Sequence, residues 1–518
     1  MNPQQFMAVP QPTTSGIVWT SIGMAILLGV SIFLGLLGKR QWKTFDEYLV
    51  GKRDIGPAVT GFAFAASAIS GWAFCGSTGI VYTIGFSGMW FAGIWSLVGQ
   101  IPCAWLAAVK TREFSMKLGA ATLSETLGRR FESKGLQTVV ALSMLMFLFL
   151  YSIGQLKAGA GVWYAVTGLP PFWCLILSVF IVYLYIVFGG YIGNQWAMAF
   201  QGAFLGLVGL VLGVAAIVWA GGFHNITASL YAQNPALIKL MRPDLPTTGA
   251  TELFSSLVGI IATPVIFFTM LIGFPHNVSR FLGMGKLKKR DFWVLVICIF
   301  AVTGIPVMLD CSSNGLVARM MYGPQLLKIE PWKGDLAAPM LAYGAGGKFL
   351  LSFYVMGLFA AALSTLAGMV FIMSANVTKD VIKLWRPQTS DKSMLYFGHF
   401  LLAVFIFAPF YWTLVNPPPL LSVFMGLAAM GMGAIFFLIT TISYYWKRAT
   451  KWGAILTVLY GTILTPIGGH LVFVKKTLGM GTFEWIMLGG CCFLYFVGSL
   501  VTKPPSEKTI SLLFPAKK

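Results

Sequence analysis

Two short stretches of the sequence combine small residues with hydroxyl groups in a pattern that suits a monovalent cation. One runs from Ala66 to Trp72, and the other runs from Ala360 to the adjacent hydroxyls of Ser364 and Thr365. Small residues allow a helix to unwind within a membrane and free its carbonyls, and a hard cation prefers carbonyl and hydroxyl oxygens. The two stretches can therefore offer sodium about five ligands. Such runs are also typical of helix-packing faces, and composition alone leaves both interpretations open.

Two charged residues lie inside apolar stretches, where a charge is costly unless it faces water, a counter-charge or a ligand. Lys157, within Gln155–Gly161, can snorkel to the outer surface, serve as counter-charge for a carboxylate substrate, or replace a coupling cation. Asp310 follows Pro306 and can pair with Lys157, relay a proton or line an outer vestibule. Because Asp310 lies near the predicted end of its apolar stretch, we expect the vestibule.

The elements that must position these residues are membrane-spanning helices. Of the 518 residues, 57% are hydrophobic and 10% are charged, and the mean hydropathy is +0.79. Apolar stretches of about 20 residues can cross a bilayer, and they predict an all-α integral membrane protein with about thirteen transmembrane helices. The predicted spans are 16–38, 57–85, 87–109, 136–165, 171–190, 195–221, 254–275, 292–314, 347–376, 394–415, 419–446, 452–474 and 482–502. Spans 57–85 and 347–376 are long and rich in small residues, so we expect a break or a marked tilt in each.

The distribution of basic residues explains the net charge of +20 and removes the motive for a nucleic-acid partner. Most of the 36 lysines and arginines fall in alternate connections, which places the N-terminus outside and the C-terminus in the cytoplasm. The first span has an uncharged start and is followed by Lys39 and Arg40, which indicates a retained anchor and not a cleaved signal peptide. The seven cysteines fall in or beside apolar spans, so we expect packing residues and no disulfide framework.

Six groups of motifs occur in a recognisable order between about residues 45 and 450. They are Phe45–Arg53; Ser70–Trp72 with Gly79–Tyr82; Phe188–Gly190 ahead of Gln201; Pro275–His276 with Arg280–Phe281; Ala361–Thr365 with Thr378–Asp380; and Tyr445–Thr450. In these motifs the chain resembles the sodium/solute symporter family, which includes the proline, pantothenate, acetate, sialic acid and sugar cotransporters. Each motif alone is weak, but their order along many spans is specific.

The resemblance implies a core of two inverted five-helix repeats with broken helices. Residues 1–56 would hold the external N-terminus, a peripheral first helix and the first cytoplasmic loop. Residues 57–253 would form the first repeat and an external loop, and residues 254–446 the second repeat. Residues 447–518 would add two peripheral helices and a short cytoplasmic tail.

The resemblance also implies a sodium site between the first helix of the first repeat and the third helix of the second. Its ligands would be the carbonyls of Ala66, Ile69 and Ala361 and the hydroxyls of Ser364 and Thr365. These positions fall in the two stretches that the residue chemistry indicated.

Two departures from the family pattern lie near this site. Many members have a polar or acidic residue where this chain has Ala68, and many have Thr-Asp where it has Ala197 and Met198. The carboxylates that would help to attract a cation are therefore absent from these positions. Acetate carriers of the family also lack the Thr-Asp pair. A sodium-independent or proton-coupled carrier that uses Lys157 and Asp310 stays an alternative.

Candidate substrate-binding residues lie near the broken helices and on the last helix of the second repeat. Besides Lys157 they are Ser70, Trp72, Met89, Phe274 and Met425. Aromatic and methionine side chains in such spans also serve commonly as packing residues.

The sequence therefore predicts a secondary active transporter of the plasma (inner) membrane, not an enzyme. It would couple sodium to the import of a small organic solute by alternating access. We expect a small carboxylate, such as a monocarboxylate, an amino acid or a pantothenate-like acid; sugars and nucleobases stay open. The only partners expected are this solute and the lipid bilayer, with no nucleic acid, no obligate protein and no cofactor besides the coupling ion. A membrane sensor with a transporter fold is the alternative class.

Overall fold

The computed structural model describes residues 6–9, 13–92, 96–330, 332–416 and 421–515. In these ranges the chain forms helices and two isolated β-bridges. The helices used below are α1 (Thr14–Lys39), α2 (Phe45–Val50), α3 (Pro57–Ala68), α4 (Thr78–Ile84), α5 (Met89–Ala92), α7 (Val109–Leu118), α8 (Leu123–Arg130), α9 (Lys134–Thr167), α10 (Pro171–Ala220), α11 (Phe223–Gln233), α12 (Glu252–Ser255), α13 (Leu257–Gly273), α14 (Pro275–Val278), α15 (Lys289–Thr303), α16 (Ile305–Tyr322), α17 (Ala337–Ala375), α18 (Asp391–Val415), α19 (Leu421–Phe436), α20 (Lys451–Gly469), α21 (Met480–Val501) and α22 (Glu507–Leu513).

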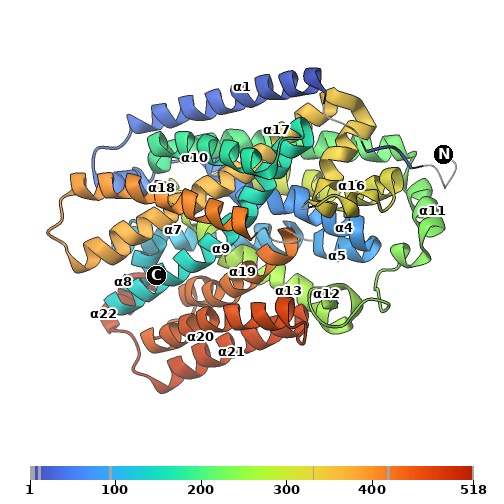
Figure 1. The fold of residues 1–518 in the computed structure, drawn as a ribbon. Coiled ribbons are helices and arrows are strands. Elements are labelled where there is room, and N and C mark those ends of the chain that lie inside the picture. The colour runs from blue at the N-terminus through green and yellow to red at the C-terminus, as the bar shows by residue number, and fades with distance from the viewer. Residues whose placement is uncertain (1–5, 10–12, 93–95, 331, 417–420, 516–518) are drawn as a thin grey trace.

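The described residues contain nine helices that are long and apolar enough to cross a membrane, or up to eleven if each of two bent pairs is one span. They form an elongated bundle, with α1 along one flank and α20 and α21 along the opposite flank (Figure 1). Two predicted spans fall outside this count as separate helices. Span 87–109 is divided into short elements around residues 93–95, which are not described, and Pro171–Phe180 is a shorter apolar helix. The number of thirteen therefore stays a prediction.

α1 shows how a peripheral helix attaches to the bundle. Its lipid side carries exposed Trp19 and Phe33, whereas small residues on its other side are buried against α10 and α17. A methyl group added at Gly38 would lie 2.3 Å from the backbone of Gly193, so this helix crossing requires glycine. Small residues at such crossings let two backbones approach closely in a membrane.

The expected break in span 57–85 is confirmed. α3 ends at Ala68, Ile69 has an extended backbone with φ −89° and ψ 93°, and helical structure resumes as a π-helical segment, Trp72–Ser77, that leads into α4. The two halves are bent by 48°. In α17 the irregular backbone lies at Gly346 and Gly347, at the edge of the predicted span 347–376.

A second broken span, which was not predicted from the sequence, lies in α13 and α14. The helix axis bends by 42° at Phe274, which has φ −58° and ψ 114°. Pro275 follows directly, and the proline ring sterically disfavours helical backbone angles at the residue before it. The two broken helices thus begin residues 57–253 and 254–446, the proposed repeats; their inverted relation stays a prediction.

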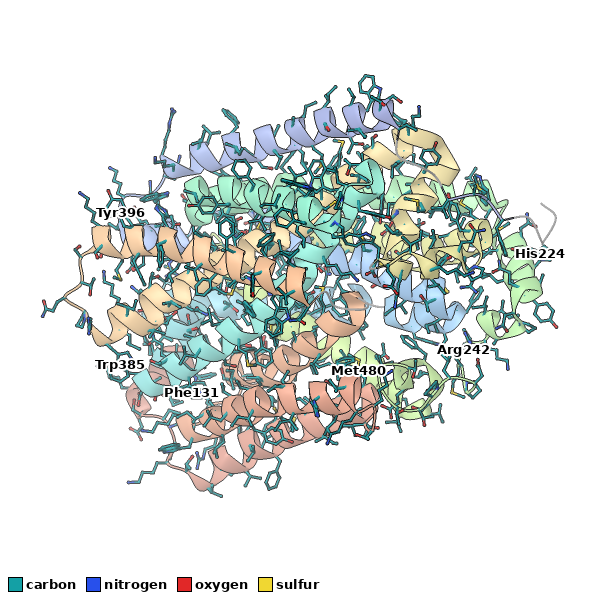
Figure 2. All side chains as sticks on the ribbon, in the orientation of Figure 1. Phe131, His224, Arg242, Trp385, Tyr396 and Met480 are labelled. Atoms are coloured by element: carbon teal, nitrogen blue, oxygen red, sulfur yellow. The ribbon has the colours of Figure 1, made fainter. Side chains whose placement is uncertain are left out.

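Connections that were predicted to share a side of the membrane meet at one end of the bundle. Lys379 pairs with Asp46 at 2.5 Å between two predicted cytoplasmic segments. On the predicted outer side, a guanidinium nitrogen of Arg242 donates to the carbonyl of Ile84 at 2.7 Å. Figure 2 shows Arg242 and Trp385 at opposite ends of the bundle. Which end faces the cytoplasm stays a prediction.

Candidate functional site

The first half of the site forms where α17 crosses the unwound end of α3. The Ser364 hydroxyl donates to the carbonyls of Ala66 and Ala361, at 3.1 Å each. The Thr365 hydroxyl lies 3.4 Å from the Ala66 carbonyl and 3.1 Å from that of Ala361. All four residues are fully buried. The two stretches that the sequence indicated therefore meet in space, and their oxygens are of the kind that sodium prefers.

The fifth expected ligand, Ile69, is buried at the start of the unwound segment. Its N–H still bonds to the carbonyl of Ala65 at 2.9 Å, and the chain leaves the helix after it. Hydrogen bonds among the described residues connect the other four expected ligands, but none of these bonds is accepted by the Ile69 carbonyl. Its role as a ligand stays a prediction.

Apolar and cationic groups surround this oxygen cluster. Met198 is fully buried and packs with Ala63 and Ala66. A methyl group added at Gly368, one turn beyond Ser364, would lie 2.0 Å from a guanidinium nitrogen of Arg280 and 3.8 Å from Cε of Met198. Arg280 is 1% exposed and also lines a pocket with Tyr191 and Asn376. Arg280 belongs to the Arg280–Phe281 motif, for which the sequence alone indicated no role.

The second half of the site lies at the unwound segment itself. The Ser70 hydroxyl is 3.2 Å from the Tyr151 hydroxyl, and the Gly71 N–H donates to Oε1 of Gln155 at 3.1 Å. The amide nitrogen of Gln155 lies 3.8 Å from the sulfur of Met425. The freed backbone of the broken helix is thus held by polar side chains of α9.

Aromatic rings complete this second cluster. Tyr151 packs edge-on against Phe274 and Trp72, with centroid distances of 5.5 and 6.3 Å. His276 lies 4.8 Å from Phe274 and 5.8 Å from Tyr151. The structure therefore brings together predicted Ser70, Trp72, Phe274 and Met425.

Three residues of this cluster, Tyr151, Gln155 and His276, were missed. Tyr151 and Gln155 are polar residues in the middle of the apolar span that contains Lys157, and that signal was available. Met89, at the start of α5, packs against the main core, and no hydrogen bond within the described part of the chain joins it to this cluster.

Lys157 forms a buried ion pair. Its Nζ lies 2.9 Å from Oδ2 of Asp335, and the two side chains are 2% and 6% exposed. Snorkelling is therefore wrong for this residue, and so is pairing with Asp310. Asp335 lies in the 3₁₀ turn Lys333–Leu336, which precedes α17.

The connection that carries Asp335 packs into the predicted outer end of the bundle. Trp332 is buried, and its ring lies 5.3 Å from that of Tyr164 on α9. Gly334 approaches the backbone of Gly79 so closely that a methyl group at Gly79 would lie 2.9 Å from it. The connection therefore touches both α9 and α4, which is the predicted outer half of the broken helix.

Asp310 is not in a vestibule, because its side chain is 0% exposed. α16 continues to Tyr322, well beyond the predicted span end at residue 314, so Asp310 lies deeper than expected. Its Oδ1 accepts from the amide of Asn314 at 2.5 Å, and Oδ2 has no hydrogen-bond partner among the described residues.

All seven cysteines are free, as expected. The part of the chain that the structure describes contains no group of three or more His, Cys, Asp or Glu side chains that can hold a metal ion.

Comparisons with known proteins identify the family of the chain. The sequence model of the sodium:solute symporter family matches residues 48–461. The chain is 24% identical to the high-affinity proline transporter PutP of Bacillus subtilis strain 168, over 92% of this chain and 97% of that protein. It is 26% identical to sodium/proline symporter 2 of Staphylococcus saprophyticus, over 95% of each.

Among solved structures, the chain is similar to a substrate-bound, outward-open Na⁺-coupled sialic acid symporter. The TM-score is 0.71 at 16% identity, and the match covers 94% of this chain and 99% of the other. This similarity shows a shared fold.

Proposed function

Because this chain belongs to the sodium:solute symporter family, we propose that it couples sodium to the import of proline or a closely related small amino acid. The observation that carries the sodium assignment is the meeting of the Ser364 and Thr365 hydroxyls with the Ala66 carbonyl at a helix break. These hydroxyls donate to carbonyls here, and after rotation their lone pairs can face an ion. Sodium enters the cycle as a transported ion, with these residues as its ligands.

The solute assignment narrows the wider expectation of a carboxylate. Curated relatives that cover nearly the whole chain are described as proline transporters, and an amino acid is itself a carboxylate. The cluster at the unwound segment suits such a molecule, because the hydroxyls of Ser70 and Tyr151 can bond a carboxylate while Trp72 and Phe274 cover an apolar ring. Monocarboxylates and pantothenate-like acids are therefore weaker candidates for the transported solute.

In this account Lys157 acts on access and not as a direct ligand of the solute. Its ammonium is engaged by Asp335, and the pair joins α9 to the connection over the outer end. Opening that end would require the pair to separate, and binding of cation and solute would favour the closed form by differential affinity. The pocket beside Arg280 lies on the side of the cation site toward Asn376, and we assign it to the inner release path.

The membrane assignments complete the proposal. The excess of lysine and arginine in alternate connections supports a topology with the N-terminus outside and the C-terminus in the cytoplasm of a plasma membrane.

Uptake of labelled L-proline into proteoliposomes tests the proposal. An inward sodium gradient is expected to drive uptake, whereas matched potassium gradients are not. Excess unlabelled proline should compete, and acetate, pantothenate and glucose should not. Competition by acetate or glucose alone would refute the amino-acid assignment, and equal uptake in potassium would refute sodium coupling.

A further inference from the structure

Asp310 presents a buried carboxyl group that the proposed cycle does not use. It is fully buried on α16 against α4, α10 and α17, and its hydrogen bonds within the described part of the chain do not reach the Ser364 cluster. Of its two carboxyl oxygens, Oδ1 accepts one hydrogen bond from Asn314 and Oδ2 has none within the described part of the chain. An ionised carboxylate in such a place would lack most of the bonds that water supplies, at a cost of several kcal/mol.

The groups that face Asp310 do not neutralise a negative charge there. On the π-helical segment before α4 the neighbour is Cys75, on α16 it is Cys311, and on α17 it is Tyr354. Cys311 and Tyr354 point their hydrogens at other acceptors, the carbonyls of Ala73 and Phe74, at 3.2 and 3.1 Å.

The remaining neighbours are uncharged or already paired. Thr78 of α4 donates to the backbone carbonyl of Asp310 at 3.3 Å, not to its carboxyl group. α10 meets this position with Gly213, where a methyl group would lie 3.5 Å from the Asp310 nitrogen. The ammonium of Lys157 is held by Asp335, and none of the described ion pairs includes Asp310.

The missing charge partner must therefore be an ion that needs little room. Sodium requires about five or six oxygen ligands, and Oδ2 of Asp310 has none of the described oxygens as a partner. A proton needs only that one oxygen. We propose that Asp310 is a proton-binding site of the transport cycle, filled from the outer side before α4 and α16 close over it.

The position of Asp310 explains how a proton can reach it. α4 is the outer half of the broken helix, and it touches both α16 and the connection that carries Asp335. When these elements separate, the Asp310 carboxylate meets outer water and binds a proton at one oxygen. When they close, the neutral carboxyl group is buried, and the proton returns to water when the site opens again. Lower external pH therefore favours closure and uptake.

This inference rests on the proposed alternating-access cycle, and its test has one readout that does not depend on sodium or proline. Infrared difference spectroscopy between the wild type and Asp310→Asn, at neutral pH, should show the C=O stretching band of a protonated, buried carboxyl group in the wild type only. A spectrum without that band would overturn the proposal, whether or not the chain transports proline.

The second readout is uptake against external pH at saturating sodium. Wild-type uptake should fall as pH rises, by up to about tenfold per pH unit, which is the limit for one proton. Asp310→Asn, a neutral isostere, should transport with a flat profile, and Glu330→Gln, which alters an exposed residue of the outer connection, should keep the wild-type profile. The proposal would be contradicted if uptake by Asp310→Asn depended on external pH as in the wild type. It would also be contradicted if Asp310→Asn lost its sodium dependence while its pH dependence stayed unchanged, because Asp310 would then be a sodium ligand.

Discussion

Lys157 and Asp335 are 178 residues apart in the sequence, and their charged atoms meet at 2.9 Å in the buried interior. A buried ion pair adds little net stability, but removal of one partner leaves an uncompensated charge that costs about 3–5 kcal/mol. In the proposed cycle this pair is the latch that holds the outer connection closed over α9.

Asp335→Asn should open this latch. Lys157 would then favour conformations in which it meets water, and Cys75, which is 3% exposed, would become accessible from outside. Mass spectrometry after treatment with a membrane-impermeant thiol reagent should find Cys75 modified several-fold faster, with Cys103 unchanged. The reversed pair Lys157→Asp/Asp335→Lys should restore protection; unaltered labelling of Cys75 in Asp335→Asn would contradict the latch.

Met198→Asp should strengthen sodium binding. Met198 packs against Ala66, so a carboxylate there would lie beside the oxygen cluster and near Arg280. A gain of about 1–2 kcal/mol corresponds to roughly a 5- to 30-fold lower sodium concentration for half-maximal uptake. Met198→Asn is the uncharged control, and an equal effect of both variants would refute the electrostatic explanation.

Tyr151→Phe should weaken proline binding and leave sodium binding intact. The variant removes the hydroxyl that meets Ser70 but keeps the ring that packs on Phe274. Loss of one hydrogen bond of about 1 kcal/mol raises the KM for proline about fivefold. Tyr164→Phe on the same helix is the matched control, since the Tyr164 ring packs against Trp332 outside this cluster. A raised sodium requirement with an unchanged KM would contradict the assignment.

Acid should loosen the C-terminal helix α22. Burial raises the pKa of Glu132, but hydrogen bonds from Ser506 and Thr509 outweigh it and hold that pKa below its usual range. The contact therefore contributes above the ordinary glutamate pKa and is lost as pH falls through the lowered value. The protection of the amides of residues 506–513, measured relative to their intrinsic exchange rate at each pH, should fall in acid, and Glu132→Gln should show that lower protection already at pH 7. Glu113→Gln, which alters an exposed carboxylate, should not.

The sequence was sufficient to bring together the two halves of the oxygen cluster, because each half has a local signal. The small residues before Trp72 indicate that the helix unwinds there, and the adjacent hydroxyls of Ser364 and Thr365 indicate possible cation ligands. The family resemblance then predicted that Ala66 and Ser364 lie close together. The break at Phe274 had a weaker signal, a single Gly-Phe-Pro sequence within an apolar run.

The long-range partners could not be predicted. Nothing local in Lys333–Leu336 indicates that Asp335 folds back onto Lys157, because that contact depends on how the connection packs between Tyr164 and Gly79. The depth of Asp310 was misjudged because the predicted span ends at residue 314, after the polar run Ser312–Asn314, whereas α16 continues to Tyr322 through mostly buried residues.

The most direct test of sodium coupling at the α3–α17 crossing is the sodium concentration that gives half-maximal proline uptake in Ser364→Ala. Loss of one ligand should raise it about tenfold, which corresponds to about 1.4 kcal/mol. Ser374→Ala, on the same helix, removes a hydroxyl that donates to the Gly398 carbonyl at 2.9 Å and should stay within about twofold of the wild type. A Ser364→Ala variant with the wild-type sodium dependence would contradict the site.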